Sequence, residues 1–594
     1  MSTAAMTGSL TERYTVWAPR ARQVTLRLER AGRRSEHVMS RGADGMHLLD
    51  EPVPRDGDRY AFRLDEDEQW LPDPRSRLQP EGVHAASAWV DLSALEHDRS
   101  WSGRDVRGAV LHELHVGTFT PGPHGRGGTF DSAIDRLPEL VDLGIDAIEV
   151  MPVAAFPGDR GWGYDGVGLF STHVAYGGPA AFARFVTAAH RHGLAVVLDV
   201  VHNHFGPDGN YHDRFGPYFT DAHHTPWGSA INLDGPDSRP VRDTLLASAR
   251  QWLVDLHLDG LRLDAVHELH DDSPRPFLAE LADVVNAWSL EVGRPLRLIA
   301  ESDRNAPRTV TPTARGGLGM DLQWADDIHH AVHAWVTGER GGYYVDFGSA
   351  RTLDQTLTRV FEHAGTYSTF RGQVWGAPVD PHSPDYDGHS FVAFLQNHDQ
   401  VGNRAAGDRI DASVDLGRHA AAAALILWGA ATPMLFQGEE WAASTPFAYF
   451  TDHESELGRL VTEGRRAEFA AMGWADRVPD PQARSTFTAS ILDWDEREDA
   501  EHARMLAWYR TVLRLRRSHR ELCDPDLARV RLDVLDEDAV VLRRGSFSLL
   551  AHRGEGRCPG LSADGAEVVA SFGTVKRSGE LSLEGPGALL VREA

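Results

Sequence analysis

The sequence contains only two cysteines, Cys523 and Cys558, among 594 residues. A fold stabilised by many disulfides is therefore excluded, although a single bridge between the two thiols stays open. The first residues also lack a basic start followed by an apolar run, so no secretory signal peptide is expected. These features favour a reducing compartment and predict a cytoplasmic location.

Positive charge is scarce relative to negative charge. The chain has 60 Lys and Arg against 87 Asp and Glu, which gives a formal net charge of −27. An acidic surface of this kind repels nucleic acids and anionic lipids, so neither is an expected partner. It also argues against a polyanionic substrate and favours a neutral one.

Long hydrophobic runs are missing as well. One uncharged stretch, residues 420–436, falls just short of the length that spans a membrane, and Pro433 would interrupt a helix there. The sequence therefore predicts a buried helix followed by a buried strand in this stretch, and no contact with a membrane.

The length exceeds one compact core and predicts two to four domains. Residues 1–95 read as a small β-sandwich, because Val24, Leu26 and Leu28 alternate with polar residues in the manner of a half-buried strand. A turn signal at residues 56–58 precedes a second alternating run from Tyr60 to Leu64. Residues 523–594 again carry short apolar runs of strand length and predict a C-terminal β-domain.

Between these ends, residues 96–522 alternate short apolar strands with helical segments. Helices are expected at residues 180–191, 242–258 and 501–517. Eight strands are expected, at residues 110–114, 147–150, 194–201, 260–263, 296–300, 320–324, 391–395 and 434–436. Eight strands alternating with helices predict an α/β fold of the (β/α)8 TIM barrel type rather than an open sheet.

Polar side chains gather where four of these strands end. The segments are residues 199–204, 260–267, 299–301 and 394–399, and each of them ends in or contains carboxylates or histidines. In a barrel of this type, functional residues lie at the carboxyl ends of the strands. These four segments are therefore expected to meet at one face of the barrel.

Asp264 and Glu301 have the chemistry that cleavage of a glycosidic bond requires. One carboxylate attacks the anomeric carbon, while a protonated carboxyl group donates to the leaving oxygen. Arg262 lies on the same side of its strand as Asp264, where a cation would lower the pKa of that carboxyl group. Glu301 must keep its proton near neutral pH, so burial and neighbouring carboxylates are expected to raise its pKa.

Each of these residues, taken singly, also has an ordinary structural explanation. A strand-end aspartate is commonly a loop cap or the partner of a cation, and the chain contains 30 histidines. The pair His202 and His204 would also suit a metal, since imidazole is a common ligand. Only the combination of four polar strand ends in barrel order favours a catalytic site.

These four segments resemble the signature regions of glycoside hydrolase family 13, the α-amylase superfamily, in order and spacing. The resemblance covers nearly the whole chain, including the β-domains on either side of the barrel. It implies Asp264 as the nucleophile and Glu301 as the general acid/base, with Asp399 as a third acidic residue that grips sugar hydroxyls. It further implies sugar or nucleophile contacts for Tyr164, Asp199, His204, Arg262 and His398.

Finer motifs resemble one subgroup of this family, the trehalohydrolases. They lie at residues 111–120, 203–211, 223–228, 301–305 and 437–441. Members of that subgroup hydrolyse the α-1,4 bond next to the terminal trehalose unit of maltooligosyltrehalose. The resemblance implies the same substrate here, and functional coupling to a maltooligosyltrehalose synthase.

Contacts with the leaving group are expected from four residues, because of their positions in the loops that carry these motifs. His267, Asp303, Arg304 and Trp227 are expected to contact the trehalose unit, although Trp227 could instead only pack its own loop. Ser302 departs from the family, whose members more often carry Asp there. Many relatives bind calcium near the position of Asn203, but the usual further ligands are not apparent, so no metal and no cofactor are expected.

Other functions stay open at this point. A glycogen branching enzyme shares the layout but transfers the cleaved chain to a sugar hydroxyl, and an α-amylase-like hydrolase would cut plain glucan. A catalytically silent glucan-binding protein is disfavoured, because binding alone would not require Asp264, Glu301 and Asp399 together.

Overall fold

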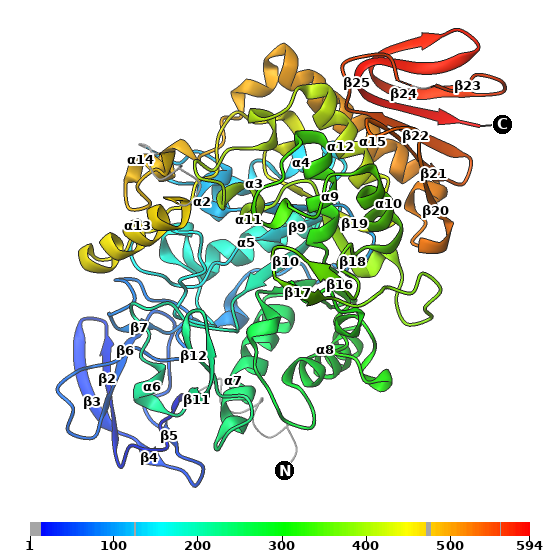
Figure 1. Ribbon diagram of the computed structural model, residues 1–594. Coiled ribbons are helices and arrows are strands. Elements are labelled where there is room, and N and C mark those ends of the chain that lie inside the picture. Colours follow the sequence, from blue (N-terminus) through cyan, green and yellow to red (C-terminus); the bar gives the residue numbers. More distant parts are fainter. Residues whose placement is uncertain (1–12, 124–125, 471–476, 559, 594) are drawn as a thin grey trace.

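The computed structural model describes residues 13–123, 126–470, 477–558 and 560–593. Its centre is a closed barrel of eight parallel strands in the order β10-β13-β14-β15-β18-β19-β8-β9 (Figure 1). The strands are β8 (Leu111–Leu114), β9 (Ala147–Val150), β10 (Ala195–Val200), β13 (Gly260–Leu263), β14 (Arg297–Ala300), β15 (Leu322–Trp324), β18 (Phe391–Phe394) and β19 (Thr432–Phe436). All eight expected strands are present, so the predicted TIM barrel is confirmed.

Alternation of side chains along each strand divides the barrel into an inner and an outer layer. Ala195 and Val197 of β10 belong to the cluster that fills the barrel, together with Ile299 and Met434. The residues between them on β10 pack outward against the helices. Because both faces are buried, the strands read as continuous apolar runs, as expected of a parallel sheet.

Helices surround the barrel between successive strands. The larger ones are α5 (Gly178–Arg191), α7 (Ser238–Arg250), α8 (Phe277–Val292), α9 (Asp326–Thr337), α10 (Ala350–Arg359), α12 (Leu416–Leu427) and α15 (Ala500–Ser518). A π-helical turn (Gln251–Asp255) extends α7, so the helix expected at residues 242–258 starts earlier and ends earlier than predicted. The apolar stretch 420–436 is divided between α12 and β19 and is buried throughout, as expected. Within the described residues, no helix is long and apolar enough to cross a membrane.

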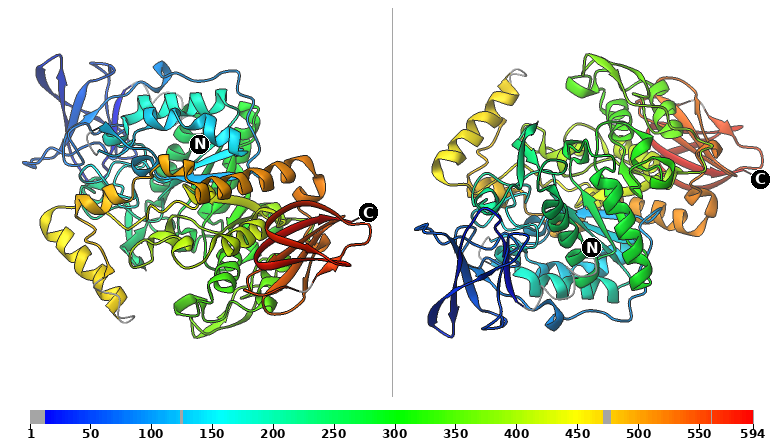
Figure 2. Two further views of the ribbon diagram at one scale, coloured as in Figure 1. Left: turned by 90° about the horizontal axis from the view of Figure 1, so that it is seen from above. Right: turned by 90° about the horizontal axis from the view of Figure 1, so that it is seen from below.

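Antiparallel sheets lie at opposite ends of the molecule in all three ribbon views (Figures 1 and 2). Near the N-terminus, β1 (Tyr14–Trp17), β5 (Met46–Leu49) and β4 (Ser40–Arg41) form one sheet. A second sheet contains β3 (Arg33–Val38), β2 (Val24–Arg30), β6 (Arg59–Leu64) and β7 (Ser87–Ala88). The alternating runs at residues 24–28 and 60–64 are therefore strands, as predicted. Trp17 meets Tyr218 of a barrel loop edge to face at 5.3 Å and so joins this part to the barrel.

The C-terminal sheet has the order β20-β21-β22-β25-β23, with β24 also paired to β25. Its strands are β20 (Val530–Val534), β21 (Ala539–Arg544), β22 (Phe547–His552), β23 (Leu561–Ser562), β24 (Glu567–Arg577) and β25 (Glu580–Arg592). The sheet packs on α12 through β22 and β25. The expected C-terminal β-domain is present, whereas the exact divisions at 95/96 and 522/523 stay predictions.

Cys523 and Cys558 are not bonded to each other. The Cys558 thiol is buried, and the Cys523 thiol donates to the backbone oxygen of Arg516 at 2.8 Å. The bridge that the sequence left open is therefore absent from the described residues.

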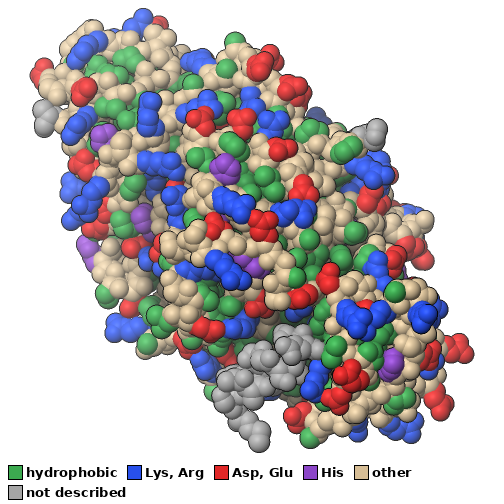
Figure 3. Space-filling model, turned by 180° about the vertical axis from the view of Figure 1, so that it is seen from behind, with side chains coloured by type: hydrophobic (Ala, Val, Ile, Leu, Met, Phe, Trp, Pro, Cys, Tyr) green, Lys and Arg blue, Asp and Glu red, His purple; other side chains and the backbone are tan. Residues whose placement is uncertain are grey.

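On the face of the molecule opposite Figure 1, acidic and basic side chains are interspersed (Figure 3).

The buried Arg516 of α15 should be important for stability. Its guanidinium donates to the backbone oxygens of Leu427, Gly429, Ala431 and Leu522, which belong to the end of α12, the approach to β19 and the start of the C-terminal region. Arg516→Met keeps an apolar stem but leaves these carbonyls without a donor, so we expect a loss of roughly 2–4 kcal/mol in stability. Thermal unfolding measures it, with Arg514→Met, an exposed residue of the same helix, as the control. Equal melting temperatures for the two variants would contradict the assignment.

Candidate active site

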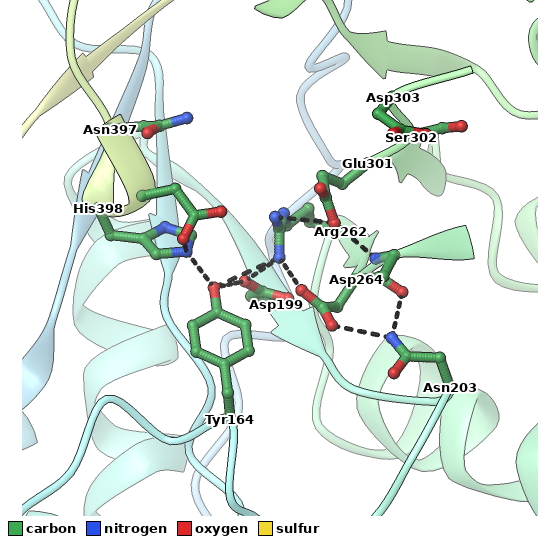
Figure 4. A network of polar contacts seen from close by, with 12 residues as sticks. Tyr164, Asp199, Asn203, Arg262, Asp264, Glu301, Ser302, Asp303, Asn397 and His398 are labelled. Atoms are coloured by element: carbon green, nitrogen blue, oxygen red, sulfur yellow. Dashed lines mark hydrogen bonds and ion pairs between the residues drawn. The ribbon is translucent and has the colours of Figure 1, made fainter. Parts of the chain in front are cut away.

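The residues predicted from the four strand ends do come together at one end of the barrel (Figure 4). β10 and β14 are the two neighbours of β13 in the barrel. Asp199 therefore lies on one side of Asp264, and Glu301 lies on the other. Their common contact is Arg262, whose side chain is completely buried.

The Arg262 guanidinium bridges all three carboxyl groups. Its Nη1 donates to Asp199 Oδ2 at 2.6 Å and to Asp264 Oδ1 at 3.1 Å, and its Nη2 lies 3.5 Å from Glu301 Oε2. Trp324, the last residue of β15, covers one face of the guanidinium at 4.1 Å. One cation in contact with both Asp264 and Glu301 places these carboxyl groups on the same side of the site, as a pair that acts on one glycosidic bond requires.

Asn203 fixes the other oxygen of Asp264. Its Nδ2 donates to Asp264 Oδ2 at 2.8 Å and to the Asp264 backbone oxygen at 2.7 Å. Both carboxylate oxygens of Asp264 thus accept a hydrogen bond, and the side chain is held with only 12% of its surface exposed. Asn203, which the sequence linked only to a calcium position, here orients the predicted nucleophile.

Glu301 is held differently. The backbone amide of Ala265 donates to Glu301 Oε2 at 2.5 Å, and Ala265 adopts a left-handed conformation with φ of 38°. Burial, opposed by Arg262 and reinforced by Asp264 and Asp399, raises the pKa of Glu301 to about 8. The carboxyl group is therefore mostly protonated at neutral pH, as the sequence predicted.

His398 is a second cation, and it lies on the other side of the Asp199 carboxylate from Arg262. Burial lowers the pKa of His398, but Glu113, 2.5 Å from Nδ1, and Asp399, 3.6 Å from Nε2, raise it to a net value of about 9. The protonated Nε2 of His398 then donates to the Tyr164 hydroxyl at 2.8 Å. That hydroxyl donates in turn to Asp199 Oδ2 at 2.6 Å.

The protonation of Asp199 and Glu149 depends on their burial and on the charged groups beside them. Burial raises the pKa of Asp199 to about 6 against the effect of Arg262, so Asp199 is mostly ionised at neutral pH. Glu149 of β9 is fully buried, and burial together with the Glu113 carboxylate raises its pKa well above the ordinary value. Burial therefore favours the neutral form of Glu149.

Tyr164 and His204 are more constrained than the sequence suggested. The Tyr164 ring stacks on His398 at 5.1 Å, and its hydroxyl is already bonded on both sides. In His204, Nε2 lies 3.1 Å from the Tyr164 backbone oxygen, and Nδ1 contacts the side-chain oxygen of Asn203. A sugar contact by His204 would require one of these bonds to open and stays a prediction. Trp227 stacks on the His204 ring at 4.3 Å and is 52% exposed, so it packs its loop while keeping one side accessible.

The loop after β14 carries the remaining predicted residues. Asp303 Oδ1 lies 3.8 Å from His267 Nε2 and 3.9 Å from Arg304 Nε, so these three predicted residues meet. Two residues that the sequence did not single out complete the group. Arg371 Nη1 lies 2.9 Å from Asp303 Oδ2, and Trp375 Nε1 donates to the Asp303 backbone oxygen at 2.7 Å. Both come from the hairpin of β16 (Thr366–Ser368) and β17 (Gln373–Trp375).

The structure offers a different candidate metal site from the one that the sequence suggested. Among the described residues, the group with ligand-like spacing is His223, Asp234 and Asp272, which includes neither His202 nor His204. Its members already pair with each other, since His223 Nε2 lies 3.2 Å from Asp234 Oδ2. His202 is buried, and burial lowers its pKa to about 4.

The motifs at strands one and eight have a structural role. Gln437, after β19, accepts from the His115 backbone amide at 2.9 Å and donates to Thr118 at 2.8 Å. These bonds join the segments that follow the last and first strands, next to the pairing of β19 with β8 that closes the barrel. Motif residues 111–120 and 437–441 thus support the site and are not all substrate contacts.

Comparison with known proteins agrees with this geometry. The alpha-amylase catalytic domain model matches residues 97–225. The malto-oligosyltrehalose trehalohydrolase of Arthrobacter ramosus is 47% identical and aligns over 98% of this chain and 100% of its own length. The chain belongs to the malto-oligosyltrehalose trehalohydrolase family.

Two further proteins are similar over most of the chain. The trehalohydrolase of Mycobacterium tuberculosis (strain CDC 1551 / Oshkosh) is 47% identical over 91% of this chain and 92% of its own. The crystal structure of a putative alpha amylase from Salmonella typhimurium superposes with a TM-score of 0.87 at 37% identity, covering 98% of this chain and 97% of that one. The predicted family is therefore confirmed, and the chain is a glycoside hydrolase.

Protonation of Glu301 should set the alkaline limit of activity. With a pKa of about 8 in the free enzyme, Glu301 loses its proton above that pH, and kcat/KM should fall tenfold per pH unit. A pH profile of kcat/KM on the natural glucoside tests the midpoint. Glu301→Gln should abolish activity on that substrate but spare the first step on a glycosyl fluoride, which needs little proton donation. Equal loss of both activities would show that Glu301 is not the acid.

Proposed function

We propose that the protein hydrolyses the α-1,4 bond next to the terminal trehalose of maltooligosyltrehalose and releases trehalose and a maltooligosaccharide. The observation that carries this proposal is the unequal treatment of two neighbouring carboxyl groups by Arg262. Asp264 accepts bonds from Arg262 and Asn203 on its two oxygens, whereas Glu301 is buried with its pKa raised to about 8. A fixed carboxylate beside a protonated carboxyl group is what the double displacement requires.

In the first step, Asp264 attacks the anomeric carbon while Glu301 gives its proton to the glycosidic oxygen. The bond to the leaving trehalose breaks, and a covalent glycosyl ester forms on Asp264. In the second step, the ionised Glu301 takes a proton from water as the water oxygen attacks the same carbon. Asp264 leaves as a carboxylate, Glu301 regains its proton, and the configuration is retained.

Asp399, Tyr164 and His398 are the groups proposed to hold the sugar at the cleavage point. The Asp399 side chain is 42% exposed, so its oxygens are accessible to sugar hydroxyls. Asn403 Nδ2 donates to Asp399 Oδ1 at 3.1 Å and helps to orient it. The Tyr164 ring, which stacks on the buried His398, is half-buried and offers an apolar face beside it, which suits the C–H face of a sugar.

Selectivity for trehalose is assigned to the group around Asp303. Arg304, Arg371 and His267 surround that carboxylate, and both arginines lie over the Trp375 ring. Trehalose joins two anomeric carbons, so its second ring takes a direction that a maltose unit cannot copy. Plain maltooligosaccharide would leave polar groups placed for that ring unpaired, which can discriminate by orders of magnitude.

The proposed substrate must be made by another enzyme. A plain glucan has no trehalose at its end, so an enzyme that converts the reducing end into trehalose must act first. Functional coupling to a maltooligosyltrehalose synthase therefore belongs to this proposal, as does a cytoplasmic location, with which two unpaired thiols are compatible.

The nucleophile can be tested by a nearly isosteric change. Asp264→Asn keeps the size and shape of the side chain but cannot attack the anomeric carbon. Turnover should fall by roughly 10³-fold or more, with thermal stability close to that of the wild type. Near-normal kcat in the purified variant would refute the assignment.

The reaction itself can be tested by NMR of early products from maltotriosyltrehalose. Trehalose and α-maltotriose are expected, because two displacements retain configuration. β-Maltotriose would refute the double displacement. Branched glucan formed from amylose without release of trehalose would instead identify a glycogen branching enzyme.

A further inference from the structure

One acidic side chain beside the site has no role in the mechanism above. Asp326 lies just beyond the end of β15, which stands between β14 and β18 in the closed barrel. The loop with Asp303 follows β14, and Asp399 follows β18. Asp326 therefore lies between the group proposed to bind trehalose and the acidic residue at the cleavage point.

The contacts of neighbouring residues show where Asp326 lies relative to the centre of the site. Trp324, two residues earlier, contacts the Arg262 guanidinium at the centre of the site. Gln400, the residue after Asp399, brings its Nε2 to 3.5 Å from Asp326 Oδ1. Asp326 itself is only partly buried, so part of its surface is accessible.

Asp326 lacks the partners that its neighbours have. Asp303 is paired with Arg371, and Asp327 accepts from the backbone amides of residues 362 and 363 and from Asn305. In the described part of the chain, Asp326 forms no ion pair, and its contact with Gln400 is at the limit of a hydrogen bond. Burial and the nearby carboxylates, Asp399 first among them, raise its pKa to about 7.

Two adjacent amide groups also have open hydrogen-bonding positions. Asn397 is 1% exposed and accepts from the Gln400 backbone amide at 2.7 Å through its oxygen, while its Nδ2 has no partner among the described residues. Gln400 Oε1 is likewise buried and without a partner in that part of the chain. Buried polar groups without partners are costly, so these two amide groups, beside the partly buried Asp326, point to a ligand that supplies the missing bonds.

We propose that Asp326, with Gln400 beside it, binds hydroxyl groups of the leaving trehalose, on the sugar next to the cleaved bond. A neutral sugar offers donors that a carboxylate lacking a cation needs, and it brings no negative charge toward Asp399 and Asp303. The assignment deepens the proposed function and rests on it, since it requires that trehalose is the leaving group.

Paired substrates separate binding of the leaving group from a general structural effect. Maltotriosyltrehalose places trehalose beside Asp326, whereas α-maltotriosyl fluoride occupies the same donor positions with no sugar there. Asp326→Asn should lower kcat/KM on maltotriosyltrehalose by roughly 10²-fold and leave hydrolysis of the fluoride within about threefold of the wild type. The inhibition constant of trehalose should rise by at least about tenfold, while that of maltotriose should not change.

Asp131→Asn is the matched control, because Asp131 also lies in the first turn of a barrel-side helix, α3 (Phe130–Ile134), but is exposed and paired with Arg184. It should behave as the wild type on both substrates. Retained activity on the fluoride also shows that Asp326→Asn is folded. Equal loss on both substrates, or no loss on either, would overturn the assignment. Wild-type enzyme that releases no trehalose would refute the proposed function instead, a result that is independent of the variant.

Discussion

The active site depends on one buried cation, the guanidinium of Arg262. Burying a lone charge inside a barrel is costly unless it is paired and hydrogen-bonded. Asp199 and Asp264 provide the pairing, and the Trp324 ring covers one face of the guanidinium. The same cation also lies 3.5 Å from Glu301, but its effect on the pKa of this third carboxyl group is smaller than that of burial, which Asp264 and Asp399 reinforce. The difference between Asp264, proposed as the nucleophile, and Glu301, whose pKa is raised to about 8, is thus a matter of charge balance around a single side chain.

The barrel makes this balance possible because it brings strand ends into fixed order. Asp199 lies near the end of β10, and Asp264 and Glu301 directly follow β13 and β14, so backbone hydrogen bonds between three consecutive strands set their spacing. His398 enters from β18, and its charge is maintained by Glu113 on β8, across the barrel from β13 and β14. In the chain of hydrogen bonds from His398 through Tyr164 to Asp199, each donor points toward Asp199.

The residues proposed to set specificity lie in parts of the chain that the barrel order does not control. Asp303 is separated from Trp375 by 72 residues, yet a hairpin brings Trp375 and Arg371 against it. No motif in the sequence indicated that contact, because neither residue follows a strand of the barrel. Asp326 was also not singled out, although it does follow a strand, because the two adjacent aspartates at residues 326 and 327 resemble the ordinary acidic first turn of a helix. Only Asp327 has such a structural role, as an acceptor for neighbouring backbone amides.

The sequence by itself determined the fold, the family and the central residues. Periodic apolar runs specified all eight strands, and polar residues at the ends of four of them identified Asp264, Glu301 and Asp399, since chemistry in a barrel collects at those ends. The tertiary structure alone decided how these groups are charged and held. The assignment of Asn203 to the nucleophile, the engagement of both nitrogens of His204, and the burial that raises the pKa of Glu301 all depend on distances between segments remote in the chain. Such distances carry no periodic signal, because they result from packing and not from the local pattern of residues.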